Sequence, residues 1–223
     1  MGRTGAHPRA ALGRLAVDIA QARAWIAAIA ATIAAHADQL TQLDAAIGDA
    51  DHGANLRRGF TAVVAALASL EAQTVGEVFI NTGTTLVSTV GGTSGPLYGS
   101  AFRAIGKPLS GATADASRLL DGLRDGLAAI QRLGAAVPGD KTMVDAYTPA
   151  VAAFERELLD GGTLASAAAR AADAAEDGMR ATTALQARKG RASYLGARSV
   201  GHQDPGATST ALVFRALATV TGR

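Results

Sequence analysis

Residues 12–33, LGRLAVDIAQARAWIAAIAATI, carry the pattern that decides the fold. Bulky apolar side chains recur there at intervals of three, four and seven residues, at Leu12, Leu15, Ile19, Ile26, Ile29 and Ile33. This is the period of a helix that buries one stripe, so we expect a helix from about residue 10 to residue 37. The chain is 48% hydrophobic but only 4% aromatic, which predicts a core of Ala, Leu, Ile and Val between close-packed helices.

The helical period continues along the rest of the chain. Thr74 and Glu77 have the spacing of a capping box, and Thr113 and Thr163 can also cap helices. With the first helix, the predicted set is 10–37, 55–70, 74–90, 96–105, 114–133, 142–159, 163–187 and 207–220. No segment predicts a strand. At 223 residues we expect one all-α domain, with short connections that place successive helices antiparallel in a bundle.

Composition excludes several classes of protein. The formal charge is only +2 and the basic residues are scattered, which argues against a nucleic-acid partner. There is no cysteine, so disulfide frameworks and thiolate metal sites are excluded. Charges and glycines interrupt every apolar run, and the first residues lack the apolar stretch of a signal peptide. We therefore expect a cytoplasmic protein without a membrane partner.

Four loops stand out between the predicted helices: IGDADHG (47–53), VGGTSG (90–95), PGDKT (138–142) and SVGHQDPGATS (199–209). They follow the first, third, fifth and seventh predicted helices. If the helices alternate in direction, loops separated by an even number of helices lie at the same end of the bundle. All four loops are therefore expected at one rim.

The first loop concentrates negative charge. Asp44, Asp49 and Asp51 lie within eight residues with no basic residue before Arg57, and such carboxylates repel one another unless a cation lies between them. Oxygen-only ligands favour a hard ion such as Mg²⁺. A calcium-binding EF-hand does not fit, because Gly53 and Phe60 occupy positions that need acids. The alternative is that these acids cap the next helix.

The second loop, with Pro96 at the start of a helix, offers backbone N–H groups and the hydroxyls of Thr93 and Ser94. These are the parts of an anion site, although a plain helix linker also explains them and no Walker lysine follows. On one rim with the aspartates, the loop favours a metal-bound nucleotide.

The remaining loops have plainer alternatives. Arg188, Lys189 and Arg191 could neutralise phosphates or form a solvated basic turn, and PGDKT predicts a turn into an Asp-capped helix. His52 and His202 could act as a base or a phosphohistidine, or serve as hydrogen-bonded loop histidines.

Four segments together resemble the nucleotide-binding L subunits of bacterial dihydroxyacetone kinases, the DhaL family. They are LDAAIGDADHGANLRRGF (43–60), VGGTSGPLYGSAF (90–102), PGDKTMVDAYTPAV (138–151) and QARKGRASYLGARSVGHQDPGATST (186–210). All four occur in the family's order, and the resemblance covers about residues 12–220. It implies an N-terminal extension at residues 1–11 and a nucleotide-binding domain of this type at residues 12–223.

The resemblance implies an eight-helix antiparallel up-and-down barrel that holds ADP or ATP and two Mg²⁺ at one rim. It implies metal ligands at Asp44, Asp49 and Asp51. The positions that match nucleotide-binding residues of the family are His52, Asn55, Thr93, Ser94, Gly134, Met143, Arg191, Asp204 and Gly206. The family often has alanine where this chain has Thr93, which a site built from backbone N–H groups tolerates.

The implied function is that of one subunit of a phosphotransferase. In members linked to the phosphotransferase system, ADP stays bound as a cofactor and is rephosphorylated by a phosphohistidine of an M subunit. The phosphoryl group then passes to dihydroxyacetone (glycerone) on a K subunit. Two alternatives stay open: an ATP-dependent subunit of a related sugar or sugar-acid kinase, and a nucleotide-loaded regulatory module that binds a transcription factor. Fatty-acid kinases carry an additional domain, which argues against that variant.

Overall fold

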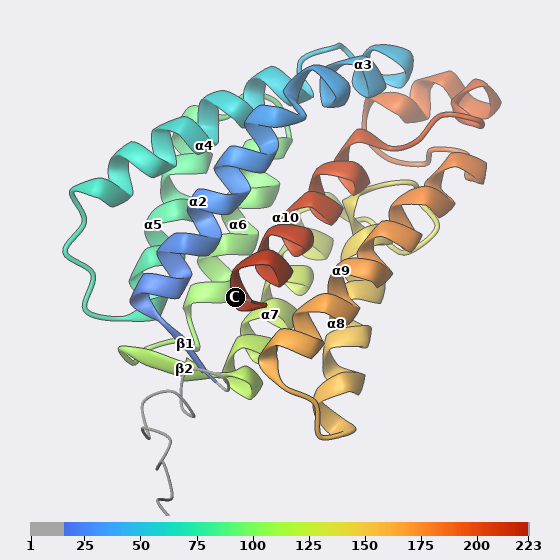
Figure 1. The fold of residues 1–223 in the computed structure, drawn as a ribbon. Helices are drawn as coiled ribbons and strands as arrows, with labels where there is room; N and C mark the ends of the chain where they lie inside the picture. The colour runs from blue at the N-terminus through green and yellow to red at the C-terminus, as the bar shows by residue number, and fades with distance from the viewer. Residues whose placement is uncertain (1–15, 223) are drawn as a thin grey trace, which may run out of the picture.

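A computed structural model describes residues 16–222. Helices make up nearly all of its regular structure (Figure 1). The α-helices are α2 (Ile19–Ala35), α3 (Ala37–Ile47), α4 (His52–Ala68), α5 (Val75–Thr89), α6 (Ser94–Gly106), α7 (Ala116–Gly134), α8 (Met143–Leu159), α9 (Leu164–Ala181) and α10 (Pro205–Thr221). The short elements are the strands β1 (Ala16–Asp18) and β2 (Thr113–Asp115) and the 3₁₀ helices η1 (Thr182–Ala184) and η2 (Arg191–Ser199).

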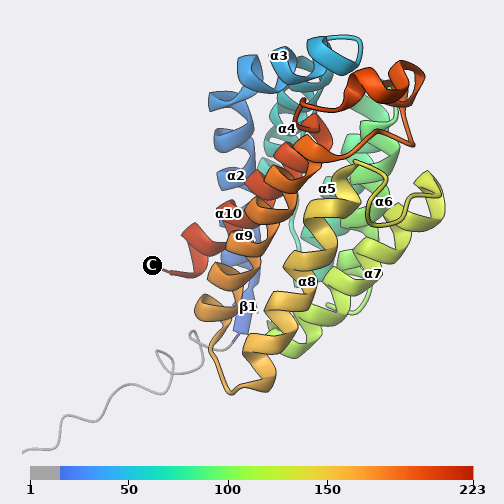
Figure 2. The same cartoon turned by 90° about the vertical axis from the view of Figure 1, so that its right-hand side faces the viewer.

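Eight of the helices form the barrel. Helix α2 packs against α4, each helix from α4 to α9 packs against the next one, and α10 closes the ring against α2. Helix α3 and η2 both lie at the same end of this barrel in two perpendicular views (Figures 1 and 2). The all-α, single-domain prediction is therefore confirmed, with α3 as an additional short helix across the rim.

The core joins small residues with a few large aromatic rings. Alanines of α9 with no exposed surface let it approach α8 and α10 closely. The sequence-based expectation of a purely aliphatic core is wrong at the centre, where Trp25, Phe79 and Phe102 pack in contact. The Trp25 and Phe79 rings meet edge to face with centroids 5.4 Å apart, and the Phe79 and Phe102 rings stack. A few aromatic residues thus fill the interior that alanines leave open.

The prediction that the chain has no strand is wrong. Ala16–Asp18 pairs antiparallel with Thr113–Asp115, so the first helix begins at Ile19 and not near residue 10. Asp18 caps it through a capping box with Gln21. Residues 10–15 of the predicted helix, and the predicted extension at 1–11, lie outside the described residues.

Other predicted boundaries shift for local reasons. Asp115, not Thr113, caps α7, because β2 continues through Asp115 and the helix begins only at Ala116. Helix α4 begins at His52, three residues before the predicted start, and α9 ends at Ala181, where a 3₁₀ turn follows. The predicted cap at Thr74 is confirmed, and α7 ends at Gly134, one residue beyond the predicted end at residue 133. Among residues 16–222, no helix combines the length and apolar character that a membrane crossing requires.

Candidate functional site

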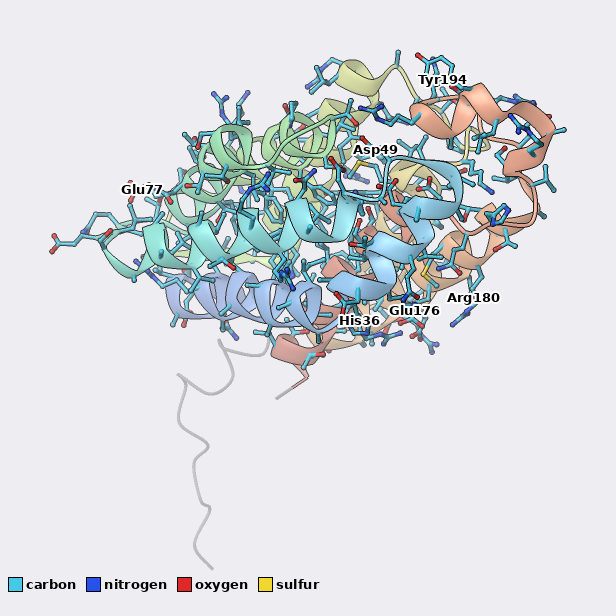
Figure 3. All side chains as sticks on the ribbon, turned by 90° about the horizontal axis from the view of Figure 1, so that it is seen from above. His36, Asp49, Glu77, Glu176, Arg180 and Tyr194 are labelled. Carbon is cyan, nitrogen blue, oxygen red and sulfur yellow. The ribbon has the colours of Figure 1, made fainter. Side chains whose placement is uncertain are left out.

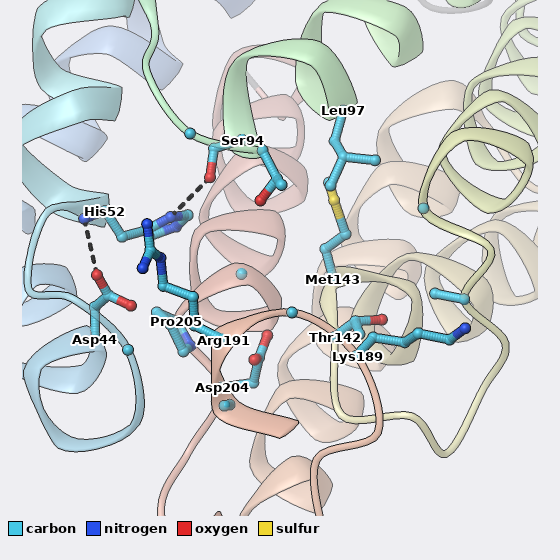
Figure 4. A pocket seen from close by; sticks show the side chains of 18 of the residues that line it. Asp44, His52, Ser94, Leu97, Thr142, Met143, Lys189, Arg191, Asp204 and Pro205 are labelled. Carbon is cyan, nitrogen blue, oxygen red and sulfur yellow. Dashed lines mark hydrogen bonds between the residues drawn. The ribbon is translucent and has the colours of Figure 1, made fainter. Parts of the chain in front are cut away.

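A pocket of about 350 Å³ opens at the barrel rim that carries α3 and η2 (Figure 4). Its wall draws on all four loops singled out in the sequence: the turn into α4, the turn into α6, the turn into α8 and the segment between α9 and α10. The prediction that these loops share one rim is therefore confirmed. The short additional elements do not alter the alternation of the eight long helices.

Three carboxylates form one side of this pocket. Asp44, at the end of α3, and Asp49 and Asp51, in the turn before α4, each place one oxygen within 4.8 Å of the others. Asp44 is buried, and its Oδ2 accepts hydrogen bonds from the backbone N–H of Asp51 (2.9 Å) and His52 (3.1 Å). The alternative that these acids cap the next helix is thus correct for Asp44, which binds N–H groups at the start of α4. No hydrogen bond within the described residues uses its Oδ1, which leaves that oxygen available to a cation.

The turn between Asp49 and Asp51 is strained. Ala50 has a φ of 62°, in the left-handed region that residues with a side chain rarely adopt. The other two such residues of the described chain, Ala135 and Lys141, lie in the turn between α7 and α8 on the same rim. Strained backbone of this kind persists where surrounding structure enforces it, commonly at binding sites.

The N-terminus of α6 faces the carboxylates across the pocket. Gly91, Gly92, Thr93 and Ser94 all line the wall. Thr93 is the N-cap of α6 but makes no capping hydrogen bond through its side chain. The first N–H groups of a helix have no partner within it and carry partial positive charge, so this side of the pocket suits an anion.

His52 connects the acidic turn to the neighbouring helices. Its Nδ1 is 3.1 Å from the Ser94 hydroxyl, and its Nε2 is 2.9 Å from the Ser209 hydroxyl, which in turn contacts the Tyr98 hydroxyl at 2.7 Å. Burial lowers the pKa of the imidazole, although the nearby carboxylates of Asp44, Asp51 and Asp49 oppose this shift. Both ring nitrogens make hydrogen bonds. This favours the interpretation that His52 is a hydrogen-bonded structural histidine and not a nucleophile.

Asp204 forms the floor of the pocket at the start of α10. Its Oδ2 accepts a hydrogen bond of 2.6 Å from the N–H of Ala207, so it caps the helix. Burial raises the pKa of this carboxyl to about 7, and the Ala207 hydrogen bond only partly opposes the shift. A carboxyl with such a pKa can accept or donate a hydrogen bond near neutral pH.

The turn before α8 differs from its predicted form. Thr142, and not an aspartate, caps α8, while Asp145 completes the capping box from inside the helix. The preceding Lys141 is 1% exposed. Its ammonium donates to the backbone carbonyls of Thr182, Leu185 and His202.

Eleven of the twelve site residues named from the sequence line the pocket. They are Asp44, Asp49, Asp51, His52, Thr93, Ser94, Gly134, Met143, Arg191, Asp204 and Gly206. The exception is Asn55, which is buried one turn into α4 and accepts a hydrogen bond of 2.8 Å from Arg58. Its side-chain amide lies beside Gly91 of the glycine loop. Asn55 is therefore next to the pocket wall but is not part of it.

Sequence reasoning missed several lining residues. Leu97, Ile130, Met143 and Val144 make part of the wall apolar, a surface suited to a flat ring such as a nucleobase. Only Met143 among these four had been named from the sequence, through the family resemblance. The other three were missed because apolar residues in amphipathic helices look like core residues. Lys189 and Arg191 supply positive charge, and the Arg191 Nε is 2.8 Å from Asp49 Oδ2. One pocket thus joins an acidic cluster, N–H donors, basic groups and an apolar wall.

Comparisons with known proteins agree with this arrangement. Residues 46–219 match the model of the DAK2 domain. The chain is 42% identical over 195 residues to the ADP-binding subunit DhaL of the PEP-dependent dihydroxyacetone kinase of Escherichia coli K12, a match covering 87% of this chain and 93% of that protein. It is also 40% identical over 194 residues to a D-erythrulose kinase of Mycolicibacterium smegmatis, covering 86% of this chain and 33% of that longer protein.

A solved structure also shares the fold. The dihydroxyacetone kinase of C. freundii in complex with AMP-PNP and Mg²⁺ superposes with a TM-score of 0.70 at 25% identity. The match covers 98% of this chain and 37% of that one, so this chain corresponds to one part of a longer kinase.

Proposed function

Because this chain belongs to the DAK2 domain family, we propose that it is the nucleotide-binding subunit of a dihydroxyacetone kinase. In this role it holds ADP or ATP with Mg²⁺ and passes the phosphoryl group to dihydroxyacetone on a separate K subunit. A phosphohistidine of an M subunit rephosphorylates the ADP in place. The E. coli relative that supports this assignment is named as an ADP-binding subunit of a PEP-dependent enzyme and spans nearly the same length.

The observation that carries the proposal is the single pocket that places Asp44, Asp49 and Asp51 opposite the N-terminus of α6. The residues present fit the metal, because three carboxylates supply only oxygen ligands, which Mg²⁺ prefers. We expect two ions, because the resemblance to the DhaL family implies that number. Bound Mg²⁺ would offset the charge on the phosphate oxygens during transfer.

Side chains and backbone groups of the protein bind the phosphates, add positive charge and exclude water. N–H groups at Thr93 and Ser94 bind and orient phosphate oxygens, and Arg191 and Lys189 add positive charge from the other side. The apolar wall at Leu97 and Met143 excludes water from one face of the base. Phosphoryl transfer depends mainly on such positioning and charge stabilisation, so no side chain needs to act as a nucleophile here.

A second candidate substrate is a longer ketose such as erythrulose. The D-erythrulose kinase of M. smegmatis contains a region 40% identical to this chain. On our proposal the ketose binds the partner, so this chain alone would not choose between the two substrates.

The test is reconstitution. The purified chain is first analysed by native mass spectrometry for bound ADP and Mg²⁺. It is then mixed with the K subunit of the E. coli kinase, with either ATP or phosphorylated M subunit as the donor, and dihydroxyacetone phosphate or erythrulose phosphate is measured. We expect product with at least one donor and none from an Asp51→Ala variant. A chain that carries no nucleotide and gives no product with either donor would refute the proposal.

A further inference from the structure

Lys141 is a buried cation at the edge of the pocket whose role the proposed function leaves unexplained. Its Nζ donates to the carbonyls of Thr182 (2.8 Å), Leu185 (3.1 Å) and His202. An ammonium has three N–H donors, and all three are used. The ammonium is therefore committed to backbone carbonyls, although other atoms of Lys141 line the pocket.

The three carbonyls come from the two ends of one segment. Thr182 and Leu185 follow α9, and His202 precedes α10. We call residues 185–203 the strap, because they include η2 and lie at the rim beside α3 (Figure 2). Tyr194, at the outer edge of the strap in the view from above, is 89% exposed (Figure 3). One side chain thus joins the beginning of the strap to its end.

A small number of other interactions hold the strap. Near its base, Gly201 N–H donates to Thr183 O (2.8 Å), Ala187 N–H donates to Ser199 Oγ (2.9 Å) and Arg188 N–H donates to Asp140 O (3.0 Å). Further out, the exposed Arg191 pairs with Asp49. Beyond the base, Ala187 and Ala192 pack with Ile47 in a small apolar cluster separate from the main core. A segment with so few buried contacts is expected to open independently of the barrel.

The backbone at Lys141 is also strained. Its φ of 62° places a residue with a long side chain in the left-handed region. Burial lowers the pKa of the ammonium, and the nearby charge of Asp204 opposes this shift. A strained backbone and a desolvated charge are both unfavourable in an ordinary turn, so the surrounding contacts must outweigh them.

We propose that Lys141 is a positioning residue that anchors the strap closed over the pocket and thereby sets Arg191 opposite the acidic cluster. It acts through the strap and does not contact the transferred group. The identity of the pocket's ligand rests on the proposed function, but the anchoring does not.

Trypsin tests the anchoring without any ligand, because the strap contains four cleavage sites, Arg188, Lys189, Arg191 and Arg198. Cleavage of each bond in the native, nucleotide-free protein is followed by mass spectrometry. Replacing Lys141 by Met removes charged hydrogen bonds to three carbonyls, so we expect at least about tenfold faster cleavage within the strap. Cleavage at Arg124 in α7 should not change.

The matched control is Lys107→Met. Lys107 is exposed after α6, at the end of that helix opposite the pocket. This variant should be cut like the wild type. Unchanged cleavage in the strap of Lys141→Met, or equal acceleration at every tryptic site, would overturn the proposal, because the second result indicates only global destabilisation.

A measurement on the unaltered protein covers the case in which Lys141→Met does not fold. The chain has three lysines, Lys107, Lys141 and Lys189, and their reaction with an amine-acetylating reagent can be followed separately. Acetylation of Lys141 should be much slower than that of Lys107. In urea below the unfolding transition it should rise in parallel with tryptic cleavage of the strap. Acetylation as fast as that of Lys107, or a strap cut freely while Lys141 stays protected, would contradict the anchoring.

A measurement of nucleotide release distinguishes a failure of the anchoring by Lys141 from a failure of the proposed function. Release of a fluorescent ADP analogue should be at least about tenfold faster from Lys141→Met than from the wild type. If the wild type binds no ADP, the proposed function fails while the proteolysis result still decides the anchoring. If the wild type binds ADP but the variant, with a faster-cut strap, releases it at the same rate, the positioning role is wrong.

Discussion

Arg191 and Asp49 form an ion pair across the mouth of the pocket, with Nε 2.8 Å from Oδ2. Arg191 comes from η2 and Asp49 from the acidic turn before α4, so the pair joins two loops that are 142 positions apart in the chain. Both side chains are substantially exposed, at 69% and 36%. An exposed pair contributes little to folding stability, which points to a role in binding.

The first prediction concerns Arg191→Ala. We expect the free energy of unfolding of the nucleotide-free protein to change by less than about 1 kcal/mol, since the pair is solvent-screened. Release of ADP should be faster, because a positive charge near the phosphates is lost. Urea unfolding and stopped-flow release of a fluorescent ADP analogue measure the two effects. A large loss of stability with unchanged release would mean that Arg191 has a structural role.

The second prediction contrasts two acids of the cluster. Asp51 is exposed and caps nothing through its side chain, so Asp51→Ala should leave the fold intact but abolish retention of ADP. Asp44 accepts two backbone hydrogen bonds at the start of α4. Asp44→Ala should therefore also lower the free energy of unfolding, by about 1–2 kcal/mol, even without nucleotide.

Mass spectrometry of the gently purified variants measures retained ADP, and urea unfolding in EDTA measures their stability. An Asp51→Ala protein that still carries stoichiometric ADP would show that the metal assignment is wrong. Chelation of Mg²⁺ should release nucleotide from the wild type and lower its melting temperature, because ligand and metal stabilise only the folded state. An unchanged melting temperature after chelation would count against the assignment.

The sequence could predict the antiparallel helix bundle and the common rim because both follow from local patterns, whereas the closed barrel was implied by the family resemblance. Stripes of alanine, leucine and isoleucine define the long helices, and their alternation brings the four loops to one end. The pairing of Ala16–Asp18 with Thr113–Asp115 was not predictable, because it joins three-residue strands nearly a hundred positions apart. The anchoring by Lys141 was hidden for the same reason, since its acceptors lie 41 to 61 residues further along the chain.

The third prediction follows from the raised pKa of Asp204. In the folded protein this pKa is about 7, well above its ordinary value of 3.8. Between these two values the folded state therefore holds a proton that the unfolded state has lost. Stability from this group is present at low pH and is lost as the pH rises toward 7, by at most about 1.4 kcal/mol per pH unit.

Asp204→Asn should remove this slope while keeping an oxygen that can cap α10. The measurement is the free energy of unfolding of both proteins in urea and EDTA from about pH 4 to pH 7. His52 contributes oppositely, because its lowered pKa costs stability as the pH falls, but both proteins share that contribution. The difference between the two curves isolates Asp204. Parallel curves would mean that Asp204 is ionised in the fold throughout this range.

The last prediction concerns the contact that sets the spacing of α5 and α6. A Cβ built on Gly83 would lie 2.4 Å from the carbonyl oxygen of Gly99, and one on Gly99 would lie 2.7 Å from that of Gly83. Alanine favours a helix, but here it forces the two backbones apart, and such overpacking costs about 1–3 kcal/mol. Gly83→Ala should therefore lower the free energy of unfolding, measured in urea. The exposed neighbour change Thr84→Ala should not, and a Gly83→Ala protein as stable as wild type would show that the helices can separate freely.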